Sequence, residues 1–170
     1  NTATKIANIV GPSDIDSDEN HIYSELGYYY TQQGQAELLN RSVLTNEGKQ
    51  LTGDSLFYDR NKGVGEAFFN VEFVDTISKN MLTGNYCYYN QLTSYAFATD
   101  KAMVIDFSQG DSLFIHADTL QMYTFNFNTD SVFREARAYH KVRFYRTDVQ
   151  GVCDSLVFSS KDSCLTMYRD

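Results

Sequence analysis

The chain has 170 residues, with 13 Tyr, 12 Phe, a single proline and no tryptophan, and 22 acidic residues stand against 14 basic ones. This length is enough for one domain with its own core, and the aromatic-rich composition favours strands. The formal net charge of -8 excludes the broad basic surface that binding to nucleic acid or to anionic membranes requires. No apolar run approaches the roughly 18 residues that a membrane-spanning segment needs.

Residues 1–21 predict one strand followed by an acidic loop. The segment KIANIV at 5–10 is strand-like, and Gly11-Pro12 predicts a turn. The acidic stretch at 14–19 then predicts a solvated loop. The sequence begins with Asn1 rather than Met, so we expect that a signal peptide has been removed or lies outside it.

Residues 22–170 are built on a repeat. LTGDSLFYD at 51–59 returns 31 residues later as LTGNYCYYN at 82–90, with looser copies at 115–122 and 152–158. A second phrase, AFFNVEFVD at 67–75, returns at 98–106 and again at 138–145. Residues 22–49 resemble an earlier unit, so 35–44 is predicted as strand although it could be taken for a helix. The third copy of the second phrase follows the second copy at a longer distance, and this added length predicts a loop or an extended hairpin at 124–131.

A fixed period of this length is typical of a stacked array. We therefore predict an all-β fold over residues 1–170: a β-solenoid or β-jellyroll of stacked antiparallel strands, about two strands per 31-residue repeat. Because successive side chains of a strand point to opposite faces, each phrase has one apolar face. Stacked in register, these faces predict two apolar ladders that face one another. The first phrase contributes Leu56, Tyr58, Cys87, Tyr89, Leu120, Met122, Leu156 and Phe158, and the second contributes Val71, Phe73, Ala102, Val104, Val142 and Phe144.

Three acids share one position of the repeat: Asp54, Asp118 and Asp154, with Asn85 in the remaining copy. Clustered carboxylates serve as acid and base in glycan-cleaving enzymes. An aspartate just before the first apolar residue of a strand can instead accept backbone N–H bonds at a bend, and we favour this structural role. The three histidines are far apart in sequence, and no metal site or other cofactor site is predicted. The alternation of inward and outward side chains along a strand predicts that His140 and Asp100 lie on the inward face.

Basic residues gather in one segment, where Arg134, Arg137, Lys141, Arg143 and Arg146 lie within 13 positions. Guanidinium groups recognise phosphate well, so Arg137, Lys141, Arg143 and Arg146 are candidates for contact with an anionic headgroup or an acidic partner. The alternative is a solvated strand face paired with acids of its neighbours. Of the three cysteines, Cys153 and Cys164 could form a bridge if their strands pair, but we favour free thiols.

Several phrases resemble one known family. GDSLFYD at 53–59, GEA at 65–67 and NVEFVD at 70–75 resemble the OstA-like (organic solvent tolerance protein A) domain, the LptA-type family of periplasmic lipopolysaccharide-transport proteins. HADT at 116–119, VRFYR at 142–146 and GVCDSL at 151–156 resemble its Bacteroidetes branch. The resemblance covers about residues 22–170. It implies a periplasmic β-jellyroll whose interior shields acyl chains, whose copies join end to end, and which catalyses no reaction.

We therefore predict a non-enzymatic periplasmic lipid-binding domain that takes part in lipopolysaccharide transport to the outer membrane, with acyl chains held between the two ladders. The predicted partners are lipopolysaccharide or a related glycolipid, and other OstA-like domains paired edge to edge. Two alternatives remain open: a structural β-solenoid interaction module with a filled core and no ligand, and a carbohydrate-binding or carbohydrate-cleaving β-helix that uses the Asp54, Asp118 and Asp154 row.

Overall fold

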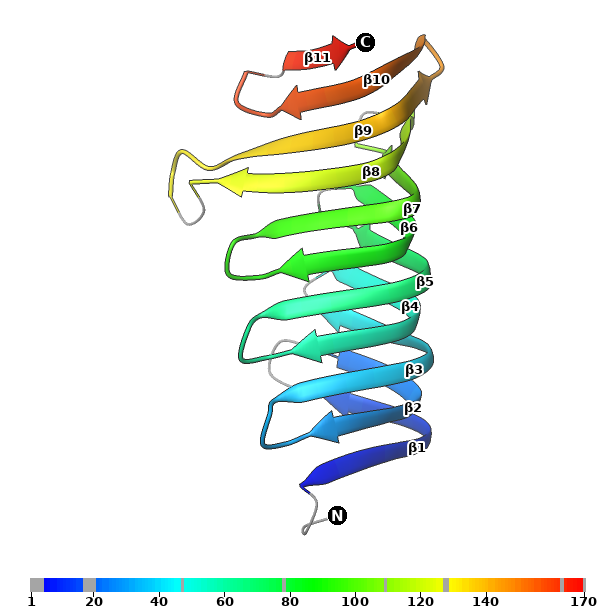
Figure 1. The fold of residues 1–170 in the computed structure, drawn as a ribbon, viewed down its shortest axis with the longest axis vertical. Coiled ribbons are helices and arrows are strands. Elements are labelled where there is room, and N and C mark those ends of the chain that lie inside the picture. Colours follow the sequence, from blue (N-terminus) through cyan, green and yellow to red (C-terminus); the bar gives the residue numbers. More distant parts are fainter. Residues whose placement is uncertain are drawn as a thin grey trace.

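The computed structural model describes residues 5–16, 21–46, 48–77, 79–108, 110–126, 129–162 and 164–169. Eleven strands stack in one tall, bent sheet, with the two chain ends at opposite ends of the stack (Figure 1). Within these ranges no helix is long and apolar enough to cross a membrane.

The strands follow one another in chain order. They are β1 (Ile6–Asp16), β2 (His21–Tyr30), β3 (Gln35–Asn46), β4 (Lys49–Asp59), β5 (Val64–Asp75), β6 (Asn80–Asn90), β7 (Tyr95–Asp106), β8 (Leu113–Phe125), β9 (Phe133–Arg146), β10 (Val149–Ser159) and β11 (Cys164–Tyr168). Within the described ranges, each strand pairs in antiparallel fashion with its neighbours in sequence and with no other strand.

The all-β fold and the two-strand repeat are confirmed. Residues 51–59 and 82–90 fall in β4 and β6, and β5 and β7 carry the second phrase. Residues 35–46 form a strand, as their repeat position predicts. The added length of the third unit forms an extended hairpin, because β8 and β9 are the longest strands and pair as far as Phe125 and Phe133. This hairpin projects beyond the other turns (Figure 1).

Each pair of long strands is interrupted by a bulge at the same height. Two residues of the odd-numbered strand lie opposite one residue of the even-numbered strand, as where Asn40 and Arg41 of β3 face Asp54 of β4. In β3, β5, β7 and β9 both bulge residues have positive φ, between 49° and 63°. In β1, Gly11 and Pro12 occupy these positions, with φ 93° at Gly11. Bulges bend the strand that carries them and increase its twist, so the aligned bulges bend the whole sheet along one line.

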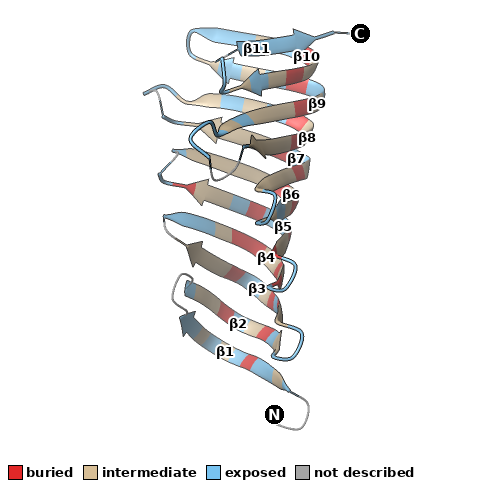
Figure 2. Cartoon of the chain, turned by 90° about the vertical axis from the view of Figure 1, so that its left-hand side faces the viewer, coloured by how far each residue is buried: buried red, intermediate tan, exposed pale blue. Residues whose placement is uncertain are grey.

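We call this line the crease, and the two halves of the sheet arm A and arm B. Arm A ends at the turns 31–34, 60–63 and 91–94, and arm B holds the opposite half of each strand. The inner face is the concave one. Its crease row is buried throughout and consists mainly of small side chains: Ser24, Ser42, Gly53, Val71, Gly84, Ala102, Ala117, Val142 and Cys153. Burial recurs at the same place along successive strands (Figure 2).

The next inner row, on arm A, is also buried and alternates in size. From β4 to β10, leucine or cysteine on the even strands lies opposite alanine on the odd strands, as in Leu56 and Ala67 or Leu120 and Ala138. The corresponding row on arm B is partly exposed. It contains Ile22, Leu44, Leu51, Phe73, Leu82, Val104, Ile115 and Phe144. The core is therefore a band that follows the crease and the adjacent row of arm A, and the two arms do not form a closed sandwich.

The N-terminal segment differs from the expectation. β1 continues through Gly11-Pro12 as far as Asp16, because these residues are its bulge and not a turn that ends it. Asp14 and Asp16 therefore lie in a strand, whereas residues 17–20 of the expected acidic loop lie outside the described residues.

The residues named for the two apolar ladders divide between the arms. Those of the first ladder, such as Leu56, lie on arm A, and those of the second, such as Val71 and Phe73, lie at the crease or on arm B. Each repeated phrase also contributes to the other arm, since Leu51 and Leu56 of one phrase lie on opposite sides of the crease.

The crease packing makes a direct prediction for stability. Val142 lies at the crease with 0% exposure, whereas Val152 on the neighbouring strand is 69% exposed on the outer face. We expect Val142→Ala to lower the free energy of unfolding by about 2 kcal/mol, because buried methyl groups are lost and a cavity remains. The same change at Val152 is expected to cost less than about 0.5 kcal/mol. Urea unfolding of both variants measures this, and equal effects would contradict the assigned crease.

Candidate functional site: the inner face of the bent sheet

The inner face changes character from the crease outwards. At the crease Val71, Ala102 and Val142 are at most 1% exposed. Farther out on arm A, the large side chains Tyr89 and Phe158 are 46% and 37% exposed. At the end of arm B the inner row becomes mostly polar, with Asn46, Lys49, Asp75, Asn80, Asp106, Leu113 and Arg146. From the crease outwards, the inner face is thus first buried, then apolar and partly exposed to solvent, and finally polar at the end of arm B, which we call the polar rim.

All the lipid-binding candidates lie on this face, and they divide into two groups. Those at the crease or beside it are buried: Leu56, Val71, Cys87, Ala102, Leu120, Val142 and Leu156. Those farther out are partly or well exposed: Tyr58, Phe73, Tyr89, Val104, Met122, Phe144 and Phe158.

Sequence reasoning missed several accessible residues on the inner face. Leu51, Leu82 and Ile115 lie in the same arm B row as Phe73 and Val104. They were missed because the period-2 pattern was read from only one side of the bulge, where the parity of inward residues changes. A signal in the sequence could have identified them. Leu51 and Leu56, on either side of the Gly-Asp pair, lie an odd number of positions apart, whereas an unbroken period-2 pattern gives even separations.

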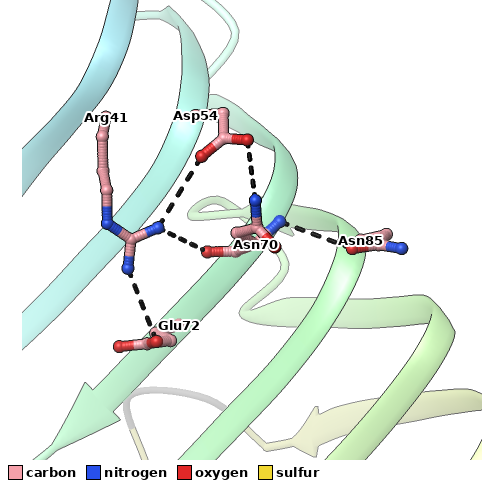
Figure 3. Close-up of polar contacts among 5 residues, drawn as sticks. All are labelled: Arg41, Asp54, Asn70, Glu72 and Asn85. Carbon is pink, nitrogen blue, oxygen red and sulfur yellow. Dashed lines mark hydrogen bonds and ion pairs between the residues drawn. The ribbon is translucent and has the colours of Figure 1, made fainter.

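The row of acids lies on the outside of the crease, where each acid is the single residue opposite a two-residue bulge. Asp54 Oδ2 accepts a hydrogen bond from Asn70 Nδ2 at 2.8 Å, and its other oxygen lies 3.7 Å from Arg41 (Figure 3). Asn85 in turn accepts a bond from the Asn70 backbone N–H at 3.4 Å. Farther along, Lys141 lies 3.3 Å from Asp118.

These contacts join the acids to the bulge residues of adjacent strands, which is a structural role at the bend. The bonds to Asp54 come mainly from side chains, not from the backbone as expected. Asp54 and Asp118 are separated by four strand spacings, about 19 Å, which is too far for two carboxylates that share one glycosidic bond. In the described part of the chain no group of three or more His, Cys, Asp or Glu side chains is placed to hold a metal ion.

His140 and Asp100 do not face inward, so that prediction is wrong. Both are bulge residues with positive φ, and both are exposed on the outside of the crease. Asp100 accepts a hydrogen bond from Asn85 Nδ2 at 3.0 Å. Asn, Asp and His are enriched among non-glycine residues in the left-handed region, which accounts for these residue types at the bend.

The structure does not bring the four basic headgroup candidates together. Arg137 lies on the outer face of arm A, bound to Glu135 and with its guanidinium 4.6 Å from the centre of the Tyr123 ring. Lys141 lies at the bend, and Arg143 lies on the outer face of arm B. Arg146 reaches the rim of arm B and donates to Asp148 at 2.9 Å. Arg137, Lys141 and Arg143 share the outer face, as parity predicts, but the bulge at His140 and Lys141 bends this face between arm A and arm B.

Burial separates the three cysteines. Cys87 lies on the inner face at 7% exposure, where burial raises the pKa of its thiol to about 12. Burial also raises the pKa of Cys153, whereas Cys164 is exposed on β11. Strands β10 and β11 do pair, but Cys164 lies opposite Ser159 rather than Cys153. Six residues of strand, about 20 Å, separate the two thiols, which is too far for a disulfide.

The fold and the inner face define a β-jellyroll formed by one open, bent antiparallel sheet. The chain belongs to the OstA-like protein family, whose model matches residues 13–105, more than half of its length. No curated protein matches it.

Among solved structures, the chain is similar to LptH from Pseudomonas aeruginosa, described as the LptA-homologous periplasmic component of the conserved lipopolysaccharide transport device. The two superpose with a TM-score of 0.57 at 15% identity, over 72% of this chain and 82% of that one. This likeness establishes the shared fold.

The burial of the inner face predicts a graded thiol reactivity. In the native protein at pH 8, we expect Cys164 to react rapidly with a maleimide. Cys87 and Cys153 should react only on unfolding, because they are buried and their raised pKa values leave little thiolate. Mass spectrometry after timed labelling measures this, and Cys164→Ser should abolish the rapid phase. Rapid labelling of Cys87 would show that water enters the inner face beside the crease.

Proposed function

We propose that this protein is a non-enzymatic, periplasmic carrier domain in lipopolysaccharide transport to the outer membrane, and that it holds acyl chains against the inner face of its sheet. Membership of the OstA-like family and the fold shared with LptH support the role in transport. The observation that carries the proposed lipid site is the outward gradient of the inner face, from a dry crease through partly exposed apolar rows to a polar rim.

This gradient matches the structure of an amphiphile. Each methylene group moved from water onto an apolar surface gains about 0.8 kcal/mol, so the exposed apolar rows can hold acyl chains without any fixed catalytic geometry. The polar rim of arm B includes Lys49, Asn80 and Arg146. A headgroup at this rim stays in water and can form hydrogen bonds with these side chains. The buried crease is already filled by its own side chains, so the proposed lipid lies along the arms and not at the crease.

A fully packed scaffold is the less favoured alternative. In such a scaffold the inner rows of both arms would exclude solvent against each other. Here the inner row of arm B, including Phe73, Val104 and Phe144, is partly exposed along its length, and Tyr89 and Phe158 on arm A are more exposed still. Exposed apolar surface that is continuous over many strands is typical of an interaction site.

The two ends of the sheet support pairing with further OstA-like domains. β11 pairs only with Ser155–Ser159 of β10, so the arm B half of β10 has no partner on that side among the described strands. Arg143, Arg146 and Arg169 lie near this end. At the opposite end, Asp14 and Asp16 lie on the arm B half of β1. Unpaired strand edges, with arginines of β9 near one end of the sheet and acids of β1 at the other, favour head-to-tail stacking of one domain on the next.

Two adjacent tyrosines of β6 give a matched test of the lipid site. Tyr89 points to the inner face, whereas Tyr88 lies on the outer face with its ring centre 5.4 Å from that of Phe97. We expect p-benzoylphenylalanine at position 89 to crosslink to lipopolysaccharide on irradiation, and the same residue at position 88 to give little product. Gel mobility and an antibody against lipopolysaccharide detect the adduct. Labelling from position 88 but not from 89 would overturn the proposal.

A further inference from the structure

The outer face of arm A carries a continuous series of aromatic rings that the transport function does not use. Cross-strand and same-strand contacts link Phe68, Tyr86, Phe97, Tyr88, Tyr95, Tyr123, Phe125 and Phe133, with neighbouring ring centres between 4.8 and 6.3 Å apart. Cross-strand aromatic pairs stabilise sheets, and most of these rings cover one another in this way. The last rings of the series, Tyr123, Phe125 and Phe133, lie on the extended β8–β9 hairpin, where the neighbouring strand β7 has ended or is about to end.

At the hairpin the sheet forms a step. The pairing of β7 with β8 ends at Ala96 and Met122, whereas β8 continues to Phe125. Among the described strands, the edge of β8 beyond Met122 therefore has no pairing partner on the β7 side, so its backbone donors and acceptors can bind another group. A depression of about 320 Å³ occupies this step, lined by Thr93, Tyr95, Tyr123, Thr124 and Phe125.

The rings in the step are held in place by their neighbours. The Tyr95 and Tyr123 centroids lie 4.9 Å apart, and those of Phe125 and Phe133 lie 4.8 Å apart at an interplanar angle of 16°. The Tyr123 hydroxyl donates to Gln121 Oε1 at 3.0 Å. A ligand that stacks here therefore finds fixed aromatic surfaces and has little ordering cost to overcome.

The step also lies where the inner and outer faces meet. Met122 and Thr124 have inner-face parity, whereas Tyr123 and Phe125 lie on the outer face. Thr124 lies directly opposite Arg134 across the β8–β9 pair, so these two side chains are neighbours. No charged side chain lines the depression itself. The lining thus combines aromatic rings with threonine hydroxyls, and Arg134 is the cross-strand neighbour of one of these threonines.

We propose that this step, which we call the hairpin step, binds a sugar ring of the glycolipid whose acyl chains lie on the inner face. A pyranose presents an apolar C–H face that can stack on an aromatic ring, and its hydroxyls can bond to Thr93, Thr124, Arg134 and the free backbone edge of β8. An acyl chain that lies along arm A past Met122 brings the sugars to the hairpin step at the end of that arm. This inference rests on the proposed function for the source of the sugar.

The test uses the oligosaccharide that mild acid releases from lipopolysaccharide, which carries no acyl chains. Titrated into the ¹⁵N-labelled protein, it should shift the backbone amide signals of Thr93, Tyr95 and Thr124. Phe125→Leu keeps an apolar side chain but removes the flat ring, and we expect it to weaken binding about tenfold. Phe114→Leu is the matched control, because Phe114 is an outer-face aromatic on arm B, at 37% exposure. It should leave binding unchanged.

The absence of shifts at the hairpin step, or equal weakening by the two leucine variants, would overturn this inference. The spectra of both variants report whether each one is folded. Because the probe has no acyl chain, its binding does not depend on the inner face. If p-benzoylphenylalanine at position 89 crosslinks to lipopolysaccharide but the oligosaccharide does not bind, only the sugar site is rejected. If the oligosaccharide binds but position 89 gives no crosslink, only the acyl-chain site is rejected.

Discussion

The two-residue bulge, repeated at one height in strand after strand, is the constraint on which the rest of this structure depends. A flat antiparallel meander of this length would expose both of its faces. The bulges bend every long strand at the same place, so one face becomes concave and can bury side chains along the crease. Each left-handed residue other than glycine costs about 1–2 kcal/mol, and burial of the crease rows offsets this cost.

The bend also explains which residue types occur where. Only small or compact side chains fit where the two arms converge, and Gly53, Gly84, Ala102 and Ala117 are examples. A Cβ atom at Gly84 would lie 3.2 Å from the Thr99 carbonyl oxygen, which shows how little room remains at the crease. On the outside of the same bend, Asp54, Asn85 and Asp118 bind bulge residues of neighbouring strands. A motif that resembles a catalytic row thus belongs to the architecture of the bend.

The repeat and the alternation of apolar residues were sufficient to predict stacked antiparallel strands and part of the inner face. What they could not supply was the bulge. Two residues of the odd strand opposite one residue of the even strand leave the 31-residue period intact. Both bulge residues face outward, so His140 and Asp100 were misplaced, and the inward parity of the even strand changes at its single residue, so Leu82 and Ile115 were missed. Arg137, Lys141 and Arg143 share the outer face, but the bend spreads them from arm A to arm B. The hairpin step was not predicted, because it depends on where β7 stops relative to β8.

The central claim is that acyl chains lie against the inner rows beyond the crease. Nuclear Overhauser contacts between lipid methylene protons and methyl groups of the protein would test it most directly. Two adjacent pairs point to opposite faces of arm B: Leu82 and Val104 lie inside, and Met81 and Ile105 lie outside. We expect contacts from bound lipopolysaccharide to the methyl groups of Leu82 and Val104 and none to those of Met81 and Ile105. Contacts to Met81 and Ile105 alone would contradict it.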